Sequence, residues 1–286
     1  MVKIDLIMQK KKYLLKITCL DKAGIVSELS TAIFHLGGFI TTFDQFSDPD
    51  TKEFFMRCVF ETDRTITNEL EHSFKKFNIK WELRNLENKP KLLILCSKER
   101  HCLNDLLNKQ KTGLLAAEIR AIVSNHNLLE EMAGWYNLPY HYLPITKETK
   151  QAQEAQIKDL VSEYEIDYIV LARYMQILSP EFCEAYPGKI INIHHSFLPS
   201  FKGANPYLQA YERGVKVIGA TAHFVTPNLD EGPIIHQETI SVDHSYTAQE
   251  LARNGSDVEA VVLSKAVKYV VDGKVFIDKH KTVVFK

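Results

Sequence analysis

The feature that most constrains this chain is the alternation of short apolar segments with helix-patterned segments after residue 91. Strand-like segments are expected at 92–95, 119–123, 140–143 and 168–171. Between them, apolar residues three or four positions apart indicate helices around 128–136 and 157–164. Strands joined by helices run parallel, because the crossover returns the chain to the same end of the sheet. The pattern therefore predicts an α/β fold with a doubly wound, mostly parallel sheet.

The first 85 residues show a different order. Strand patterns are expected at 13–20, 39–46, 54–60 and around 81–83, and the Gly37-Gly38 pair ends the first of two amphipathic helices. The order of elements is βαββαβ, a ferredoxin-like sandwich. Apolar residues anchor the first helix at Ile25, Val26, Leu29, Ala32, Ile33 and Leu36, and the second at Leu70, Phe74 and Phe77.

A polar segment that ends in proline, Leu86–Pro90, separates these two patterns. Proline disfavours helix in the residue before it, and a fresh apolar strand begins directly afterwards. We therefore expect two domains, at 1–88 and 89–286.

The charge balance argues against a nucleic-acid or membrane partner. Lys and Arg number 35 against 36 for Asp and Glu, so no net field attracts the chain to polyanions. The longest apolar runs have the length of strands, and the start Met1–Asp5 lacks the layout of a secretion signal. A cytoplasmic protein is expected.

The cysteines point to ordinary buried thiols. They number five and are widely spaced, at Cys19, Cys58, Cys96, Cys102 and Cys183. Without a CxxC pair, neither a disulfide framework nor a zinc knuckle is indicated.

Candidate catalytic side chains follow a strand in the second domain. Asn192 and His194 are two residues apart at a strand end, so strand alternation points both to one face. A second strand, 219–225, leads into a loop that presents Asp230. An amide donor, an imidazole and a carboxylate are the groups that acyl transfer requires.

Three blocks carry a family resemblance. Asn192–Gly203, Thr221–Thr226 and Asp230–Pro233 are similar to the folate-dependent formyltransferases, over roughly residues 91–286. The resemblance implies that the catalytic residues are Asn192, His194 and Asp230. Asn192 would donate to the oxyanion, His194 would shuttle the proton or polarise the carbonyl, and Asp230 would position water and hold the imidazole.

The segment Leu171–Ser179 resembles the folate cleft of that family. Backbone groups there would bind the pterin edge, whereas the alternative is a strand-to-helix turn with Met175, Ile177 and Leu178 in the core. For His223 and His195 a structural role is the alternative, and alternation is expected to point His195 away from His194. The candidate substrate-binding residues are Arg173, Met175, Gln176, Ile177, Leu178, His223 and Asn228.

The entry to the first helix, Asp21–Val26, resembles that of ACT domains. Gly24 would let the backbone approach a carboxylate at the helix N-terminus. This predicts an amino-acid effector, with glycine or methionine as candidates, and a homo-oligomer, either dimer or tetramer. A pure dimerisation platform is the alternative. The candidate effector-binding residues are Asp21, Ala23, Gly24, Ile25 and Val26.

The pairing of the two domains resembles the deformylase branch of the family. That branch hydrolyses 10-formyltetrahydrofolate to tetrahydrofolate and formate, which supplies formate for purine synthesis and balances the one-carbon pool. Relatives that formylate glycinamide ribonucleotide carry a glycine-rich loop for its phosphate, but Cys96–Cys102 contains no glycine. Water is therefore the expected acceptor, with the folate as substrate and no cofactor or metal.

Other interpretations stay open. Phosphoribosylglycinamide formyltransferase is the nearest, and a non-catalytic folate or amino-acid sensor is another. A metal hydrolase using His194 and His195 is disfavoured, because adjacent strand residues point to opposite faces. Formylation of tRNA is disfavoured by the neutral charge balance. It is also disfavoured because the second domain is expected to finish with only one helix, 247–271, and a hairpin, 275–285.

Overall fold

The computed structural model describes residues 10–286 except 65, 67–68, 76–77 and 201–205. The predictions for Met1–Asp5 and Phe77, and the end of the motif at Phe201–Gly203, lie outside the described residues. The chain divides into two compact units, and the boundary between them lies between Lys89 and Pro90. The boundary predicted from sequence falls after residue 88.

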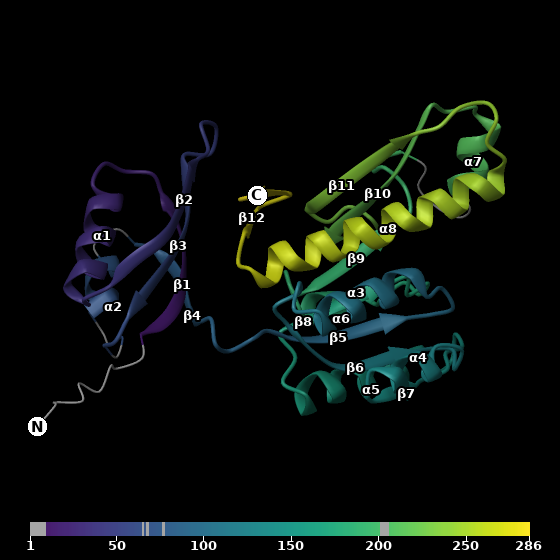
Figure 1. Ribbon diagram of the computed structural model, residues 1–286, viewed down its shortest axis with the longest axis horizontal. Coiled ribbons are helices and arrows are strands. Elements are labelled where there is room, and N and C mark those ends of the chain that lie inside the picture. Colours follow the sequence, from purple (N-terminus) through teal and green to yellow (C-terminus); the bar gives the residue numbers. More distant parts are fainter. Residues whose placement is uncertain (1–9, 65, 67–68, 76–77, 201–205) are drawn as a thin grey trace, which may run out of the picture. The chain divides into compact units, whose positions relative to one another are not determined.

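The first unit confirms the predicted βαββαβ order (Figure 1). Its four-stranded sheet has the order β2-β3-β1-β4, and β1 runs antiparallel to both β3 and β4. The edge strand β2 is antiparallel to β3. The elements are β1 (Lys11–Leu20), α1 (Ile25–His35), β2 (Phe39–Ser47), β3 (Glu53–Thr62), α2 (Glu69–Lys75) and β4 (Lys80–Asn85).

One face of this sheet packs against both helices. Ile25, Leu29 and Ile33 form the buried stripe of α1, at the helical spacing expected from the sequence. Leu70 and Phe74 bury the matching side of α2. The buried residues of both helices pack against alternate residues of β1 and β3, because every second side chain of a strand lies on the same face of the sheet. These strand residues are Leu15, Ile17, Cys19, Phe54, Met56, Cys58 and Phe60.

The second unit contains a seven-stranded sheet with the order β11-β10-β9-β8-β5-β6-β7. Strands β5 to β9 run parallel, whereas β10 is antiparallel to β9 and β11, so the predicted mostly parallel sheet is confirmed. The strands are β5 (Lys91–Cys96), β6 (Glu118–Ser124), β7 (Tyr140–Tyr142), β8 (Tyr168–Ala172), β9 (Ile190–His194), β10 (Val217–Phe224) and β11 (Ile234–Ser241).

Helices cover both faces of this sheet, each over its own apolar cluster (Figure 1). The predicted α4, α5, α8 and terminal hairpin are confirmed, and Thr247 caps α8 in a capping box with Glu250. The sequence analysis did not identify α3, which lacks a side-chain cap, or α6, α7 and β11. The bounds are α3 (His101–Lys111), α4 (Glu130–Trp135), α5 (Lys150–Glu163), α6 (Pro180–Ala185), α7 (Pro206–Glu212), α8 (Ala248–Val271), β12 (Val275–Asp278) and β13 (Lys281–Val284).

The strand order fixes where a ligand can bind. From β5 the chain builds β6 and β7 on one side and then returns to build β8 and β9 on the other. At such a reversal the connections diverge and leave a crevice outside the carboxyl ends of the strands. The segments after β5, β8 and β9 therefore meet at the candidate site.

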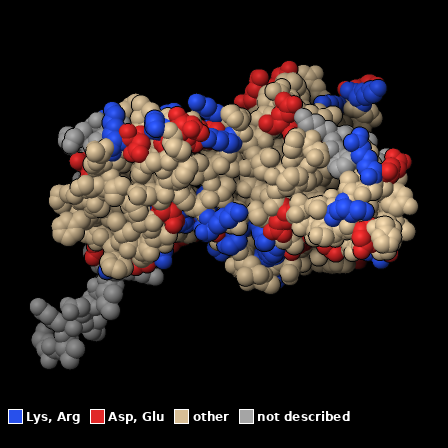
Figure 2. Space-filling model, turned by 90° about the horizontal axis from the view of Figure 1, so that it is seen from above, with Lys and Arg blue, Asp and Glu red and all other residues tan. Residues whose placement is uncertain are grey.

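The distribution of charge on the surface and the apolar character of the helices agree with what the composition suggests. Figure 2 shows basic and acidic side chains interspersed over the visible face, as the formal charge of −1 suggests. Among the described residues, no helix combines the length and apolar character needed to cross a membrane.

The turn from β10 to β11 requires glycine at position 232. A Cβ atom there would lie 1.7 Å from the carbonyl oxygen of Phe224, whose N–H donates to the oxygen of Pro233 at 2.9 Å. We expect Gly232→Ala to lower the free energy of unfolding by about 1–3 kcal/mol, because the clash is with backbone. Urea unfolding of the purified chain measures the change.

The matched control is Gly134→Ala in α4, where a Cβ atom would meet nothing within 4 Å. It should raise the free energy of unfolding by about 0.5–1 kcal/mol, since alanine favours helix. Equal effects of the two substitutions would contradict the role of Gly232.

Candidate active site

Two antiparallel strands bring the first three polar side chains together. Asn192 and His194 are on β9, and Asn192 lies directly opposite His223 of β10 in the register. Asn192 Nδ2 lies 3.2 Å from His223 Nε2. Asn192 thus contacts His223, and His194 and His223 both contact one carboxylate.

That carboxylate belongs to Asp230, in the loop from β10 to β11. Its Oδ2 lies 3.3 Å from His194 Nδ1, and its Oδ1 lies 3.7 Å from His223 Nε2. Asp230 has a φ of 57°, a left-handed conformation that aspartate adopts more readily than most residues. The Glu231 N–H donates to the Asn228 carbonyl at 3.3 Å, so Asn228 helps to close this loop.

The carboxylate is the charged member of the group. Burial alone would raise the pKa of Asp230, but its interactions with His194 and His223 outweigh burial and lower that pKa well below the usual value. His194 is 5% exposed and His223 is 2% exposed. An ionised Asp230 therefore lies between two buried imidazoles.

The hydrogen bonds orient both imidazoles. His223 Nδ1 lies 2.8 Å from the Phe224 carbonyl oxygen, so Nδ1 carries a proton, because a carbonyl only accepts. By the same reasoning His194 Nδ1 carries a proton toward Asp230. The other nitrogen of His194, Nε2, is buried and has no hydrogen-bond partner among the residues that the structure describes. With its proton on Nδ1, His194 leaves the Nε2 lone pair open to a bound substrate.

The position of His195 differs from the expectation. Alternation predicted that His195 would point away from His194, but β9 ends at His194 and the ring centroids lie 5.3 Å apart. Burial, more than the nearby charge of Arg173, lowers the pKa of His195 to about 4. His195 is therefore neutral near pH 7.

The segment after β8 presents apolar side chains to the surface. Met175 is 54% exposed and Ile177 is 62% exposed, whereas Leu178 is buried. The alternative that all three are core residues is therefore wrong for two of them. The Met175 N–H donates to Ser97 Oγ at 3.1 Å, and the Gln176 N–H donates to the Tyr174 carbonyl at 2.7 Å.

Arg173 turns inward from this segment. Its Nε lies 3.3 Å from Glu259 Oε2, and its side chain is 14% exposed. Glu259, on α8, also interacts with His101 Nε2 at 2.8 Å and accepts from the Tyr207 hydroxyl at 2.5 Å. Burial would raise the pKa of Glu259, but these partners lower it.

Sequence reasoning missed Glu259, His101 and Tyr207. One signal was present for Glu259: it is an acid among apolar residues at helical spacing, next to Val258 and near Val262 and Leu263. A carboxylate in an apolar stripe is rarely buried without a partner. No local signal identified the partners, since they come from α3, α7 and the segment after β8.

The same cluster contains the one group of described residues that could hold a metal ion: His101, Cys102 and Glu259. The cation already paired with Glu259 is Arg173. Burial, the largest cause, raises the pKa of the Cys102 thiol well above its usual value, so the thiol is protonated. A protonated thiol and a competing guanidinium make this group a poor metal site.

At the predicted effector site, Gly24 precedes α1 with a φ of 95°. Asp21, Ala23 and Val26 are exposed, whereas the side chain of Ile25 belongs to the core. Ile25, which is 2% exposed, therefore offers no side chain to a ligand.

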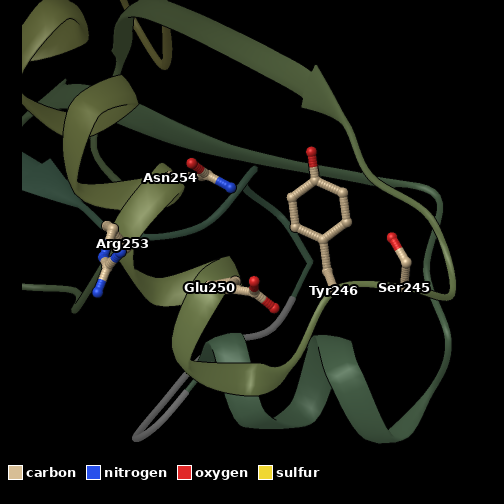
Figure 3. A pocket seen from close by; sticks show the side chains of 5 residues that line it. All are labelled: Ser245, Tyr246, Glu250, Arg253 and Asn254. Carbon is tan, nitrogen blue, oxygen red and sulfur yellow. The ribbon is translucent and has the colours of Figure 1, made fainter.

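The second unit has one pocket beside the candidate site and another beside its long helix. One, of about 340 Å³, is lined by residues that include His195, Phe197, Tyr207 and Ile218. The other, of about 380 Å³, lies at the start of α8 and contains none of the predicted residues (Figure 3). Its lining is Ser245, Tyr246, Glu250, Arg253 and Asn254.

His195 should make stability depend on pH. Its folded-state pKa of about 4 lies below the ordinary 6.5, so unfolding takes up a proton between those values. Stability from this group is therefore lost as pH falls below about 6.5. Between pH values of about 4 and 6.5, we expect His195→Gln to reduce the slope of the unfolding free energy against pH by up to about 1.4 kcal/mol per pH unit.

Urea unfolding at several pH values between about 4 and 7 measures this slope. The control is His280→Gln, which removes an exposed imidazole from the terminal hairpin and should reproduce the wild-type profile. An unchanged slope in His195→Gln would contradict the assignment.

Known proteins match both the sequence and the fold. A family model described as formyl transferase matches residues 90–267. The formyltetrahydrofolate deformylase of Bacillus subtilis is 44% identical over 278 residues, which are 95% of this chain and 93% of that protein. The crystal structure of formyltetrahydrofolate deformylase from Burkholderia mallei superposes with a TM-score of 0.92 at 42% identity, covering 96% of this chain and 100% of the other.

A structure of phosphoribosylglycinamide formyltransferase from Anaplasma phagocytophilum matches less of the chain. Its TM-score is 0.64 at 31% identity, and the match covers 70% of this chain and 96% of that one. The deformylases thus match both units, whereas the transferase matches a shorter part. The chain belongs to the formyltetrahydrofolate deformylase family.

Proposed function

We propose that this protein hydrolyses 10-formyltetrahydrofolate to tetrahydrofolate and formate. The observation that carries the proposal is the arrangement of His194. Its Nδ1 faces the Asp230 carboxylate at 3.3 Å, while its buried Nε2 has no partner among the described residues. The full-length similarity to deformylases supplies the substrate.

His194 and Asp230 act on water in this proposal. His194 Nε2 accepts a proton from water as the water oxygen bonds to the formyl carbon. Asp230 stabilises the resulting imidazolium, because the carboxylate keeps its charge beside Nδ1. The same proton then passes to N10 of the folate, the bond from carbon to N10 breaks, and formic acid leaves and releases its proton to solvent as formate.

Asn192 stabilises the intermediate. As water adds, the formyl oxygen becomes an oxyanion that needs a donor already in place. Asn192 Nδ2 lies 3.2 Å from His223 Nε2, so one amide N–H is donated to that nitrogen and the second N–H remains for the oxyanion. His223, with its own proton on Nδ1 toward the Phe224 carbonyl, is thus a positioning residue for Asn192.

The folate binds along the segment after β8. The exposed side chains of Met175 and Ile177 would cover a face of the pterin ring, and backbone groups of 173–178 would bind its edge. Arg173 contributes through its backbone, because its side chain is paired with Glu259. Asn228 contributes by holding the Asp230 loop.

The physiological role follows from the products. Formate released here would supply purine synthesis, and the reaction would balance the pool of one-carbon folates. Purine synthesis and the one-carbon folate pool would both be in the cytoplasm, where the sequence predicts this protein to be. The alternative activity, phosphoribosylglycinamide formyltransfer, receives support from a similarity that covers 70% of this chain, against 96% for a deformylase.

The first unit acts as an ACT-type regulatory and oligomerisation domain in this proposal. Its βαββαβ order and the positive φ of Gly24 support a backbone approach by an amino-acid carboxylate at the start of α1. Glycine and methionine are the candidate effectors. A dimer or tetramer would pair these domains.

Asp230→Asn tests the catalytic proposal. The wild type should release formate from 10-formyltetrahydrofolate without any amine acceptor. In the variant kcat should fall by about 10²–10⁴, because the imidazolium loses its counter-charge, while folate affinity stays within several-fold. Formate assay and equilibrium binding measure the two quantities.

Asp159→Asn is the matched control, since it removes an exposed carboxylate of α5. It should leave kcat unchanged. Near-normal turnover of Asp230→Asn, or formate release that requires glycinamide ribonucleotide, would reject the proposal.

Gly24→Val tests the effector. Calorimetry should detect glycine or methionine binding to the wild type and not to this variant, because the branched side chain blocks the backbone. Gly113→Val, at a φ of 78° in the second unit with open space around it, is the control and should retain binding. Absence of heat with both amino acids would remove the proposed effectors.

A further inference from the structure

The segment after β8, which carries the proposed pterin site, has no regular backbone structure. Residues 173–179 lie between β8 and α6 and belong to neither a helix nor a strand. Within the segment, the Gln176 N–H donates to the Tyr174 carbonyl at 2.7 Å. Buried backbone groups outside a helix or a sheet need other partners. Side chains from other elements therefore set the course of this segment.

Helix α5 holds the segment near its start and at its end. The Tyr174 hydroxyl donates to Gln153 Oε1 at 3.0 Å. Glu154, which is 7% exposed, accepts the Ser179 N–H at 2.8 Å and the Ser179 hydroxyl at 2.5 Å. The exposed side chains of the proposed pterin site lie between these two anchors.

A serine that follows β5 holds the backbone between the anchors. The Met175 N–H donates to Ser97 Oγ at 3.1 Å. Strand β5 lies between β8 and β6 in the sheet, and its last residue, Cys96, is level with Ala172 of β8 and Ser124 of β6. Ser97 is 3% exposed, so water has little access to replace its hydroxyl. The strand order thus brings this serine against the segment.

The Ser97 hydroxyl is oriented by the residue that follows β6. Ser97 Oγ donates to Asn125 Oδ1 at 2.7 Å, and Asn125 is 8% exposed. A hydroxyl has one proton and two lone pairs, so the lone pairs are left for the Met175 N–H. The Ser124 hydroxyl donates to the Ser97 carbonyl at 3.3 Å, which also holds the backbone of Ser97. We call Ser97 and Asn125 the Ser97–Asn125 pair.

We infer that the Ser97–Asn125 pair positions the folate-binding segment: by accepting the Met175 N–H, the Ser97 hydroxyl fixes the backbone of 173–178 in the course that folate binding requires. Both members are positioning residues that act through Met175. This role rests on the proposed folate site and adds the side chains that hold it in shape. The chemical step belongs to other residues, so losing the pair should weaken binding more than it slows turnover.

The test uses Ser97→Ala in the full chain. The dissociation constant of tetrahydrofolate is measured by calorimetry, and KM and kcat are measured by formate release from 10-formyltetrahydrofolate. We expect the dissociation constant and KM to rise about tenfold, because a buried N–H loses its partner and the segment loses its anchor. The value of kcat should stay within about twofold of the wild type.

Two further variants separate positioning from stability. Ser97→Thr keeps the hydroxyl and should bind tetrahydrofolate within about threefold of the wild type. The control is Ser162→Ala, which removes an exposed hydroxyl of α5 that donates to the Lys158 carbonyl at 3.1 Å. It should leave both constants unchanged. A role in stability alone would lower the melting temperature of Ser97→Ala without changing its affinity for tetrahydrofolate.

A second measurement does not depend on turnover or on a ligand. Hydrogen exchange of the Met175 amide should be slow in the wild type and at least about tenfold faster in Ser97→Ala, because the hydrogen bond that protects it is lost. If Ser97→Ala does not fold, Asn125→Leu serves in both measurements. Leucine has a similar volume but no acceptor for the Ser97 hydroxyl, so exchange should quicken and tetrahydrofolate affinity should fall.

The outcomes distinguish this role from the proposed function. A wild type that neither binds tetrahydrofolate nor releases formate overturns both. A wild type that releases formate, with unchanged tetrahydrofolate affinity in a folded Ser97→Ala, overturns only the role of the pair. Faster exchange of the Met175 amide without loss of affinity has the same meaning, since the pair would then hold a segment that folate does not need.

Discussion

The catalytic end of the second unit depends on one ionised carboxylate placed between two imidazoles. Asp230 Oδ2 lies 3.3 Å from His194 Nδ1, and Oδ1 lies 3.7 Å from His223 Nε2. This position sets which nitrogen of His194 carries the proton and which is left without a partner among the described residues. The fold supplies it through the β9 and β10 register and through Gly232, which lets the loop return against Phe224.

A second buried carboxylate organises the neighbouring space. Glu259 gathers Arg173, His101 and Tyr207, which come from the segment after β8, from α3 and from α7. Asp230 and Glu259 thus have different roles. In the proposed hydrolysis Asp230 stabilises the imidazolium of His194, whereas Glu259 brings buried side chains from three elements together. His195 lies between them and stays neutral because burial lowers its pKa to about 4.

Much of the fold follows from local patterns. The βαββαβ order and the mostly parallel sheet follow from apolar periodicity, and Gly37 and Thr247 mark helix ends. The unpredicted α3 has no capping side chain, and α7 is only seven residues long. The start of α6 is marked by the capping Ser179 and by Pro180, a signal that the sequence analysis did not use. A short helix without such signals is formed by packing, which the local sequence does not encode.

Local sequence patterns predicted the two units, the strand end that carries Asn192 and His194, and the family. Strand alternation and the motif spacing are local properties, so they can be read along the chain. Packing between distant elements turns His195 toward His194, leaves Met175 and Ile177 exposed, and pairs Arg173 with Glu259. Arg173 and Glu259 are 86 residues apart, and the burial that gives their charges such influence exists only when the elements pack.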